Sequence, residues 1–94
     1  MTNRIAFVGG GNMATSLIGG LVARGTPPSS IAVADPEASQ RARLEHDYGV
    51  TAAADAPAAV VGARTVVLAV KPQQMAQVAR SIAGQVAAAG ALVI

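Results

Sequence analysis

Short apolar runs alternate along the chain with longer segments in which apolar residues recur at helical spacing. The short runs suit strands that are buried on both faces of a parallel sheet, and the longer segments suit helices packed on that sheet. Because strands that alternate with helices pair in parallel through right-handed crossovers, the pattern predicts an α/β fold. The predicted strands comprise residues 5–8, 31–34, 50–53, 66–70 and 91–94.

Glycine and proline mark the ends of the predicted helices, as they commonly do. The three long helices are predicted over residues 12–24, 37–48 and 73–89. Each is followed by a glycine, namely Gly25, Gly49 or Gly90. Asp55 is placed to cap a further, short helix with Pro57 in its first turn, where proline costs least. One face of the last helix carries Met75, Val78, Ile82 and Val86.

The composition fits one domain with an aliphatic core. The chain has 94 residues, of which 52% are hydrophobic and only 2% aromatic, so the core must consist of Val, Ile, Leu and Ala. Met13 and Met75 are expected to fill core space. The chain stops inside an apolar run that reads as a strand. We therefore expect residues 1–94 to be the front part of a longer polypeptide.

The charged and polar residues exclude several classes of function. Lys and Arg are scattered at a formal net charge of +2, so no nucleic-acid partner is expected. The absence of cysteine excludes disulfides and cysteine-based metal sites and fits a cytoplasmic protein. No set of carboxylates and histidines indicates a metal site, and His46 is expected at the surface. No signal peptide or bilayer-spanning stretch is found, so no membrane partner is expected.

The first predicted strand leads into the run Gly9-Gly10-Gly11-Asn12-Met13-Ala14. This run matches the dinucleotide-binding pattern G-x-G-x-x-G/A at Gly9, Gly11 and Ala14. Gly9 permits a tight turn, Gly11 lets the backbone approach a pyrophosphate, and Ala14 lets the helix pack close to the strand. The start of the helix directs free N–H groups at the phosphates. Because the run lies between a predicted strand and a predicted helix, it indicates an NAD or NADP site rather than a ligand-free turn.

Asp35 ends the second predicted strand, 21 residues after Ala14. A carboxylate there accepts hydrogen bonds from the adenosine ribose of NAD and repels the 2′-phosphate of NADP. Arg41 and Arg43 could offset that charge if either turned inward. A second interpretation makes Asp35 the cap of the next helix, with Pro36 in the first helical position. The two roles are compatible.

Lys71, the single lysine of the chain, follows the fourth predicted strand. Ligands of doubly wound sheets bind at the carboxyl ends of the strands, near the switch in strand order. Its cation is therefore placed for cofactor phosphates or for a substrate carboxylate. The alternative is a solvated side chain at a strand end.

Three segments carry a family resemblance: residues 5–14 with 18–21, residues 48–50, and residues 68–75. They read IAFVGGGNMA with IGGL, then YGV, then LAVKPQQM, and they resemble the cofactor domain of pyrroline-5-carboxylate reductases. The resemblance covers essentially the whole chain. It implies a Rossmann-type doubly wound parallel sheet that is incomplete here, because family members carry a further, helical C-terminal domain.

The resemblance also implies a function. Members of the family reduce 1-pyrroline-5-carboxylate to L-proline with NAD(P)H, the last step of proline biosynthesis, in the bacterial cytoplasm. The family's substrate site lies between cofactor and helical domain at a subunit interface. A homo-oligomer formed through that domain is thus expected, and residues 1–94 alone are expected to be inactive. No catalytic residue is identified in this part of the enzyme.

By the same resemblance, two groups of residues would hold the cofactor. Those that would cradle its pyrophosphate are Gly9, Gly11, Asn12 and Met13. Those that would line the path toward the nicotinamide are Ala69, Val70, Lys71 and Pro72. The chain departs from the family where many members carry a small hydroxyl residue at Asp35, an asparagine at Ala56 and an acid at Arg64. The first departure leaves the choice between NADP and NAD open.

Two other functions remain as alternatives. One is another NAD(P)-dependent reductase of the 6-phosphogluconate/β-hydroxyacid dehydrogenase-like superfamily, or an F420-type NADP reductase. The shared G-x-G-N-M turn does not separate these enzymes, whereas Val70-Lys71-Pro72 favours the pyrroline-5-carboxylate reductases. The other is a non-enzymatic nucleotide-binding module, which the absence of recognisable catalytic side chains suggests.

Overall fold

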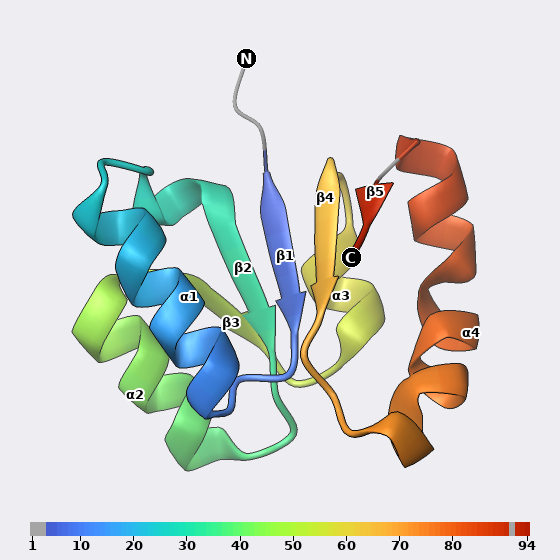
Figure 1. Cartoon of the computed structure of the whole chain (residues 1–94), viewed down its shortest axis with the longest axis horizontal. Helices are drawn as coiled ribbons and strands as arrows, with labels where there is room; N and C mark the ends of the chain where they lie inside the picture. Colours follow the sequence, from blue (N-terminus) through green and yellow to red (C-terminus); the bar gives the residue numbers. More distant parts are fainter. Residues whose placement is uncertain (1–3, 91) are drawn as a thin grey trace.

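The computed structural model describes residues 4–90 and 92–94. Within these residues one parallel sheet has the strand order β3-β2-β1-β4-β5 (Figure 1). Its strands are β1 (Ile5–Val8), β2 (Ile31–Ala34), β3 (Thr51–Ala53), β4 (Thr65–Leu68) and β5 (Leu92–Val93). The order reverses at β1, which pairs with β2 on one side and β4 on the other, so the sheet is doubly wound.

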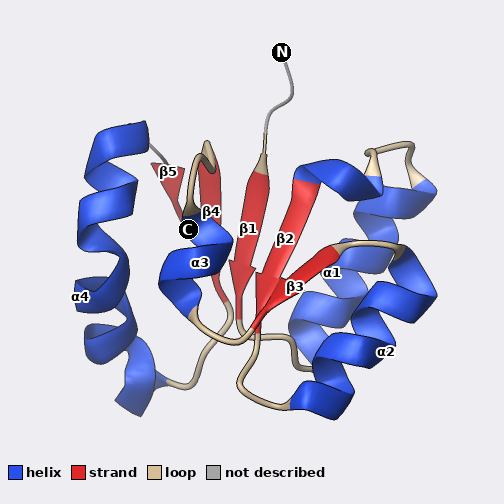
Figure 2. Ribbon diagram, turned by 180° about the vertical axis from the view of Figure 1, so that it is seen from behind, coloured by secondary structure: helices blue, strands red, loops and turns tan. Residues whose placement is uncertain are grey.

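Helices cover both faces of the sheet (Figures 1 and 2). One layer contains α1 (Asn12–Ala23) and α2 (Ala38–Tyr48). The other contains α3 (Ala56–Val60) and α4 (Pro72–Ala89). A short 3₁₀ turn, η1 (Pro28–Ser30), leads into β2 and was not predicted from the sequence. The α/β class and the doubly wound Rossmann-type sheet are confirmed.

Each face of the sheet has its own apolar cluster. Phe7 of β1 packs with Ile18 of α1 and Leu44 of α2. The neighbouring Val8 belongs to the opposite cluster, with Ile82 of α4. Alternate residues of one strand thus hold the two helical layers. A third, small cluster of Ala32, Ala34 and Ala59 lets α3 approach β2 closely. The aliphatic composition therefore gives a core of tightly spaced layers.

Several predicted boundaries are shifted in the structure. The fourth strand is Thr65–Leu68 rather than residues 66–70, because Leu68 is paired with Val8, where β1 ends. The third strand begins at 51 instead of 50, and the first helix ends at 23 instead of 24. The last helix begins one residue early, at 72. The fifth predicted strand includes Ala91, which lies outside the described residues, and β5 is shorter than predicted.

Two expectations about exposure have different outcomes. Met13 does not fill core space: it is 62% exposed, because it lies on the outward side of the first turn of α1. His46 is exposed, as predicted, with 88% of its side chain accessible. In the described part of the chain, no helix is both long enough and apolar enough to cross a membrane.

Candidate functional site

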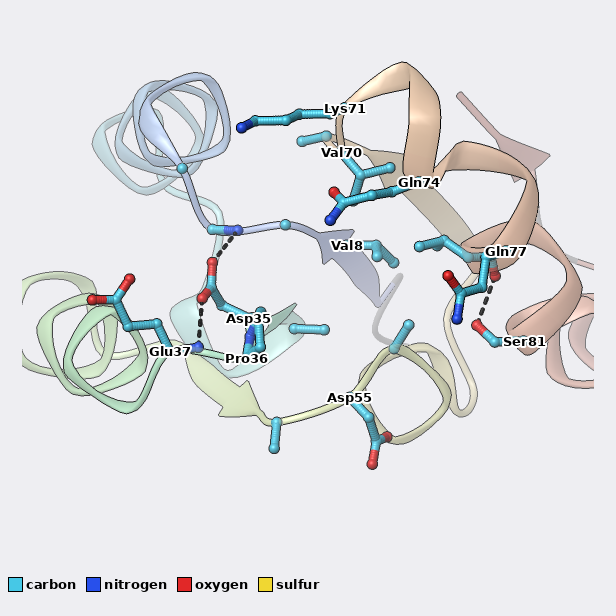
Figure 3. A pocket seen from close by; sticks show the side chains of 18 of the residues that line it. Val8, Asp35, Pro36, Glu37, Asp55, Val70, Lys71, Gln74, Gln77 and Ser81 are labelled. Atoms are coloured by element: carbon cyan, nitrogen blue, oxygen red, sulfur yellow. Dashed lines mark hydrogen bonds between the residues drawn. The ribbon is translucent and has the colours of Figure 1, made fainter.

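An open cavity of about 790 Å³ lies at the carboxyl ends of β1, β2 and β4, where the strand order reverses (Figure 3). Of the predicted cofactor-binding residues, those that line it are Gly9, Gly10, Gly11, Asp35, Ala69, Val70 and Lys71. The structure therefore brings together three segments that are far apart in sequence. Four predicted residues lie beside the cavity rather than among its lining residues: Asn12, Met13, Ala14 and Pro72.

Gly9 makes the turn from β1 into the loop that precedes α1. Its φ is +102°, a conformation that side-chain-bearing residues rarely adopt, and a Cβ there would collide with the carbonyl oxygen of Ala69. The backbone N–H of Gly9 donates to Ala34 O at 2.8 Å, and Ala69 N–H donates to Val8 O at 2.8 Å. The loop after β1 is thus held between the ends of β2 and β4.

Gly11 and the first turn of α1 provide the anion-binding geometry that the motif predicts. A Cβ on Gly11 would have no heavy atom within 4 Å, so the backbone there is open to a ligand. No side chain caps the start of α1, and its first hydrogen bond runs from Thr15 N to Gly11 O at 2.9 Å. Helix N-termini of this kind attract phosphates. Ala14 is fully buried against the sheet, which fits its predicted packing role.

Gly10, the middle residue of the motif, is held by the segment that follows β2. Its N–H donates to Asp35 Oδ2 at 3.0 Å, and its carbonyl oxygen accepts a hydrogen bond from Gln40 Nε2 of α2. A Cβ on Gly10 would lie 2.9 Å from Leu44 Cδ1, so glycine is needed here for space. Sequence reasoning missed Gln40, because no local signal connects it to a residue 30 positions earlier.

Asp35 uses both carboxylate oxygens to order the loops around it. Oδ2 accepts from Gly10 N, and Oδ1 accepts from Glu37 N at 2.8 Å (Figure 3). The expectation that it caps the next helix is wrong, because α2 begins only at Ala38 and has Glu37 as its uncapped N-cap residue. The carboxylate remains half-exposed and lines the cavity. Each oxygen keeps a lone pair for a ligand hydroxyl.

Of the two arginines that could offset this charge, Arg41 turns toward Asp35 and Arg43 points away from it. Arg41 Nη1 donates to the backbone oxygen of Asp35 at 2.8 Å. Arg43 lies 3.8 Å from Asp47 on the exposed side of α2. Among the described residues, neither guanidinium forms an ion pair with the Asp35 carboxylate. The side of the cavity near Asp35 and Glu37 thus carries two carboxylates, with the Arg41 guanidinium beside the first of them.

Lys71 lies at the opposite side of the cavity, as the N-cap residue of α4. Its side chain is exposed and extends along the cavity toward the side where α1 begins (Figure 3). Among the described residues that line the cavity, Lys71 is the one lysine or arginine. Its position fits a phosphate or carboxylate contact better than a role in the fold.

The first turns of α4 supply a polar wall that sequence reasoning also missed. Gln74, Gln77 and Ser81 line the cavity, as does the loop of residues 54–57. Their helical spacing places them on one face of α4, which is the signal that could have identified them. Asp55 in that loop accepts from Ala58 N at 3.0 Å, and so caps α3 as predicted.

The comparison with protein families agrees with this geometry. A family described as "NADP oxidoreductase coenzyme F420-dependent" matches residues 4–94 of the chain. The chain belongs to this family. Its description names NADP, so membership of the NADP oxidoreductase family supports a nicotinamide cofactor for the cavity.

Curated proteins that are similar to this chain include several pyrroline-5-carboxylate reductases. That of Pseudomonas aeruginosa is 48% identical over 82 residues, which are 87% of this chain and 30% of the relative. That of Vibrio alginolyticus is 42% identical over 79 residues, covering 84% of this chain and 29% of the relative. The predicted resemblance is confirmed. The chain spans about 30% of the length of these relatives.

Solved structures support the same fold. A pyrroline-5-carboxylate reductase from Coxiella burnetii superimposes with a TM-score of 0.93 and 33% identity, over 99% of this chain and 34% of that one. The WlbA dehydrogenase of Bordetella pertussis, in complex with NADH and UDP-GlcNAcA, matches with a TM-score of 0.71 at 21% identity. This second likeness covers 99% of this chain and 28% of the dehydrogenase, and it shows the fold alone.

Proposed function

We propose that residues 1–94 are the NAD(P)H-binding domain of an enzyme that reduces 1-pyrroline-5-carboxylate to L-proline, the last step of proline biosynthesis. The observation that carries the proposal is the cavity at the strand switch, where an uncapped helix N-terminus and a glycine loop face open space. The names of the curated relatives support the substrate. We place this enzyme in the cytoplasm, a location that the lack of cysteine in the sequence fits.

In this proposal the chain binds and orients a dinucleotide. The backbone N–H groups of Gly11, Asn12 and Met13 hold the pyrophosphate, because α1 directs them at the loop without a side-chain cap. Ala69 and Val70, with Lys71, line the path toward the nicotinamide. When bound, NAD(P)H supplies a hydride to the carbon of the substrate's C=N bond, and a proton is added to the nitrogen.

We also propose that the domain prefers NADH to NADPH. Two carboxylates, Asp35 and Glu37, line the side of the cavity where the adenosine ribose would lie. Asp35 can accept hydrogen bonds from ribose hydroxyls, whereas a 2′-phosphate would meet its charge. Arg41 keeps its charge beside Asp35, where it donates to a backbone oxygen, so this side of the cavity carries two carboxylates against one guanidinium.

The test is a titration of the protein at its natural length with NADH and NADPH, followed by an assay with 1-pyrroline-5-carboxylate. We expect tighter binding of NADH and formation of proline. Binding of a dinucleotide without reduction of this substrate would leave the domain assignment and overturn the substrate, in favour of a sister reductase or a non-enzymatic module. Failure to bind either dinucleotide would overturn the whole proposal.

A second candidate is supported by the family description, which names coenzyme F420. Such an enzyme would exchange a hydride between F420 and NADP and would need no imine substrate. Reduction of NADP by reduced F420, with no turnover of 1-pyrroline-5-carboxylate, would favour it. The acidic side of the cavity argues against it, because NADP carries the extra phosphate.

Two further features follow from the resemblance to the reductases. The substrate would meet the cofactor at an interface made by a helical C-terminal domain, through which subunits form a homo-oligomer. Residues 1–94 alone would then bind the cofactor but would not reduce 1-pyrroline-5-carboxylate. Proline formation by the isolated 94 residues would contradict this part of the proposal.

A further inference from the structure

The peptide group between Gly10 and Gly11 is oriented by a side chain from α2. Gln40 Nε2 donates to Gly10 O from a half-buried position, across 30 residues of sequence. Thr15 Oγ1 approaches the same oxygen at 3.4 Å but makes its shorter hydrogen bond, of 2.8 Å, to Gly11 O. Gln40 is therefore the principal donor to the Gly10 carbonyl.

The direction of one end of a peptide group fixes the direction of the other. In a trans peptide the C=O and the following N–H lie in one plane and point in opposite directions. Because Gln40 draws Gly10 O toward α2, the N–H of Gly11 must point away from α2. A Cβ on Gly11 would meet no heavy atom within 4 Å, so the space around this residue is open to a ligand.

The preceding peptide group is fixed in the same way from the same side. Gly10 N–H donates to Asp35 Oδ2 at 3.0 Å, so both polar groups of Gly10 bind side chains and neither is free for a ligand. Glycine is the most flexible residue, and a run of three would leave the loop without a defined shape. The contacts from Asp35 and Gln40 supply that shape before any ligand arrives.

We infer that Gln40 is a positioning residue for the cofactor: it aims the Gly11 N–H at the pyrophosphate of the dinucleotide. The inference rests on the proposed function, because it requires that a dinucleotide occupies the cavity. Gln40 is not among the residues that line the cavity, so it would not contact the ribose or the reacting atoms. It acts only through the Gly10–Gly11 peptide.

The experiment replaces Gln40 by methionine, which has a similar length and no donor, in the protein at its natural length. Without Gln40 the loop must be ordered when the ligand binds, and if that cost equals one neutral hydrogen bond, the Kd for NADH should rise about fivefold to tenfold. Because every dinucleotide has the same pyrophosphate, the Kd for NADPH should rise by the same factor. ADP-ribose, which lacks the nicotinamide, should lose affinity equally.

Three comparisons separate positioning from a merely structural role. The kcat should be unchanged while KM for the cofactor rises, because Gln40 is remote from the reacting atoms. The unfolding midpoint should fall by only about 4–8 °C, as the loss of one hydrogen bond implies, so the variant stays folded at the temperature of the titration. Gln85→Met on α4, outside the lining of the cavity, is the matched control and should change neither constant. Gln40→Ala, a good helix residue, is the second variant if Gln40→Met does not fold.

The outcomes are distinct. Kd values for NADH within twofold of the wild type in both Gln40 variants would overturn the inference and leave the proposed function intact. A loss for NADPH much larger than for NADH would also overturn it, since that pattern belongs to a ribose contact. A wild-type protein that binds neither dinucleotide would overturn the proposed function, and this inference with it.

Discussion

At the scale of single residues, the three glycines of the motif are required for three different reasons. Gly9 needs a positive φ and space beside Ala69, whereas Gly10 needs space beside Leu44. Gly11 has neither constraint, and its missing side chain matters only to a ligand. The sequence pattern predicts the roles of Gly9 and Gly11. It treats Gly10 as any residue, because the crowding there comes from α2.

Gly9→Ala should lower the free energy of unfolding by at least about 2 kcal/mol, since it combines backbone strain with a steric clash. Gly84→Ala is the matched control. Gly84 lies inside α4 with open space around it, so the same substitution should raise stability by about 0.5–1 kcal/mol. Chemical denaturation of both variants measures the difference. Equal stabilities would contradict the assigned role of Gly9.

Asp35→Asn should shift the preference between cofactors. The substitution keeps the shape of the side chain and removes the charge that would face a 2′-phosphate, so the ratio of Kd for NADPH to Kd for NADH should fall about tenfold. Asp47→Asn, on the exposed side of α2, removes an equal charge away from the cavity and should leave the ratio unchanged. Both constants are measured by fluorescence titration. Because Asp35 also holds Gly10, the substitution can change both constants together, so the ratio between them is the informative quantity.

At the scale of elements, sequence signals predict the type and order of the helices and strands. They do not predict an element's end where that end depends on a neighbour in space. The start of α3 was predictable because Asp55, its cap, acts within three residues. The end of β4 was not, because it depends on the length of β1, its neighbour in space. The contact of Gln40 with the glycine loop was equally hidden, since it exists only once α2 packs beside α1.

The end of α3 offers a matched pair of adjacent valines. Val60 is 1% exposed and belongs to the cluster with Ile82 and Val66, whereas Val61 is 55% exposed. Val60→Ala should therefore lower the free energy of unfolding by about 2 kcal/mol, and Val61→Ala by less than about 0.5 kcal/mol. Thermal or urea unfolding measures both. A similar loss in the two variants would mean that α3 does not pack on the sheet as described.

At the scale of the whole molecule, the cavity exists only in the folded state. Its lining comes from the segments that follow β1, β2, β3 and β4 and from α4, and these segments meet only through the sheet. The position of such a site at the strand switch was predictable from the alternation of strands and helices together with the glycine motif. Its polar wall on α4 was not, because the lining of a cavity depends on the final packing.

Cofactor should consequently stabilise the fold. A ligand that binds only the native state, present at 100 times its Kd, adds about 2.7 kcal/mol to the free energy of unfolding. We expect saturating NADH to raise the unfolding midpoint, and nicotinamide alone to leave it unchanged. A midpoint that does not respond to either dinucleotide would contradict the site.

The central place of β1 has a consequence for how the chain folds during synthesis. The strand and its glycine loop are made first, yet the loop is held by Ala69, which emerges from the ribosome about 60 residues later. The pairing of β1 with β4 is thus a long-range contact, of the kind that forms slowly. A nascent chain that ends before β4 contains the entire glycine motif, Asp35 and the Ala34 acceptor of Gly9 N–H, but it lacks the hydrogen bond from Ala69 to Val8 that holds the other side of the turn. Cofactor can therefore guide only the last stage of folding.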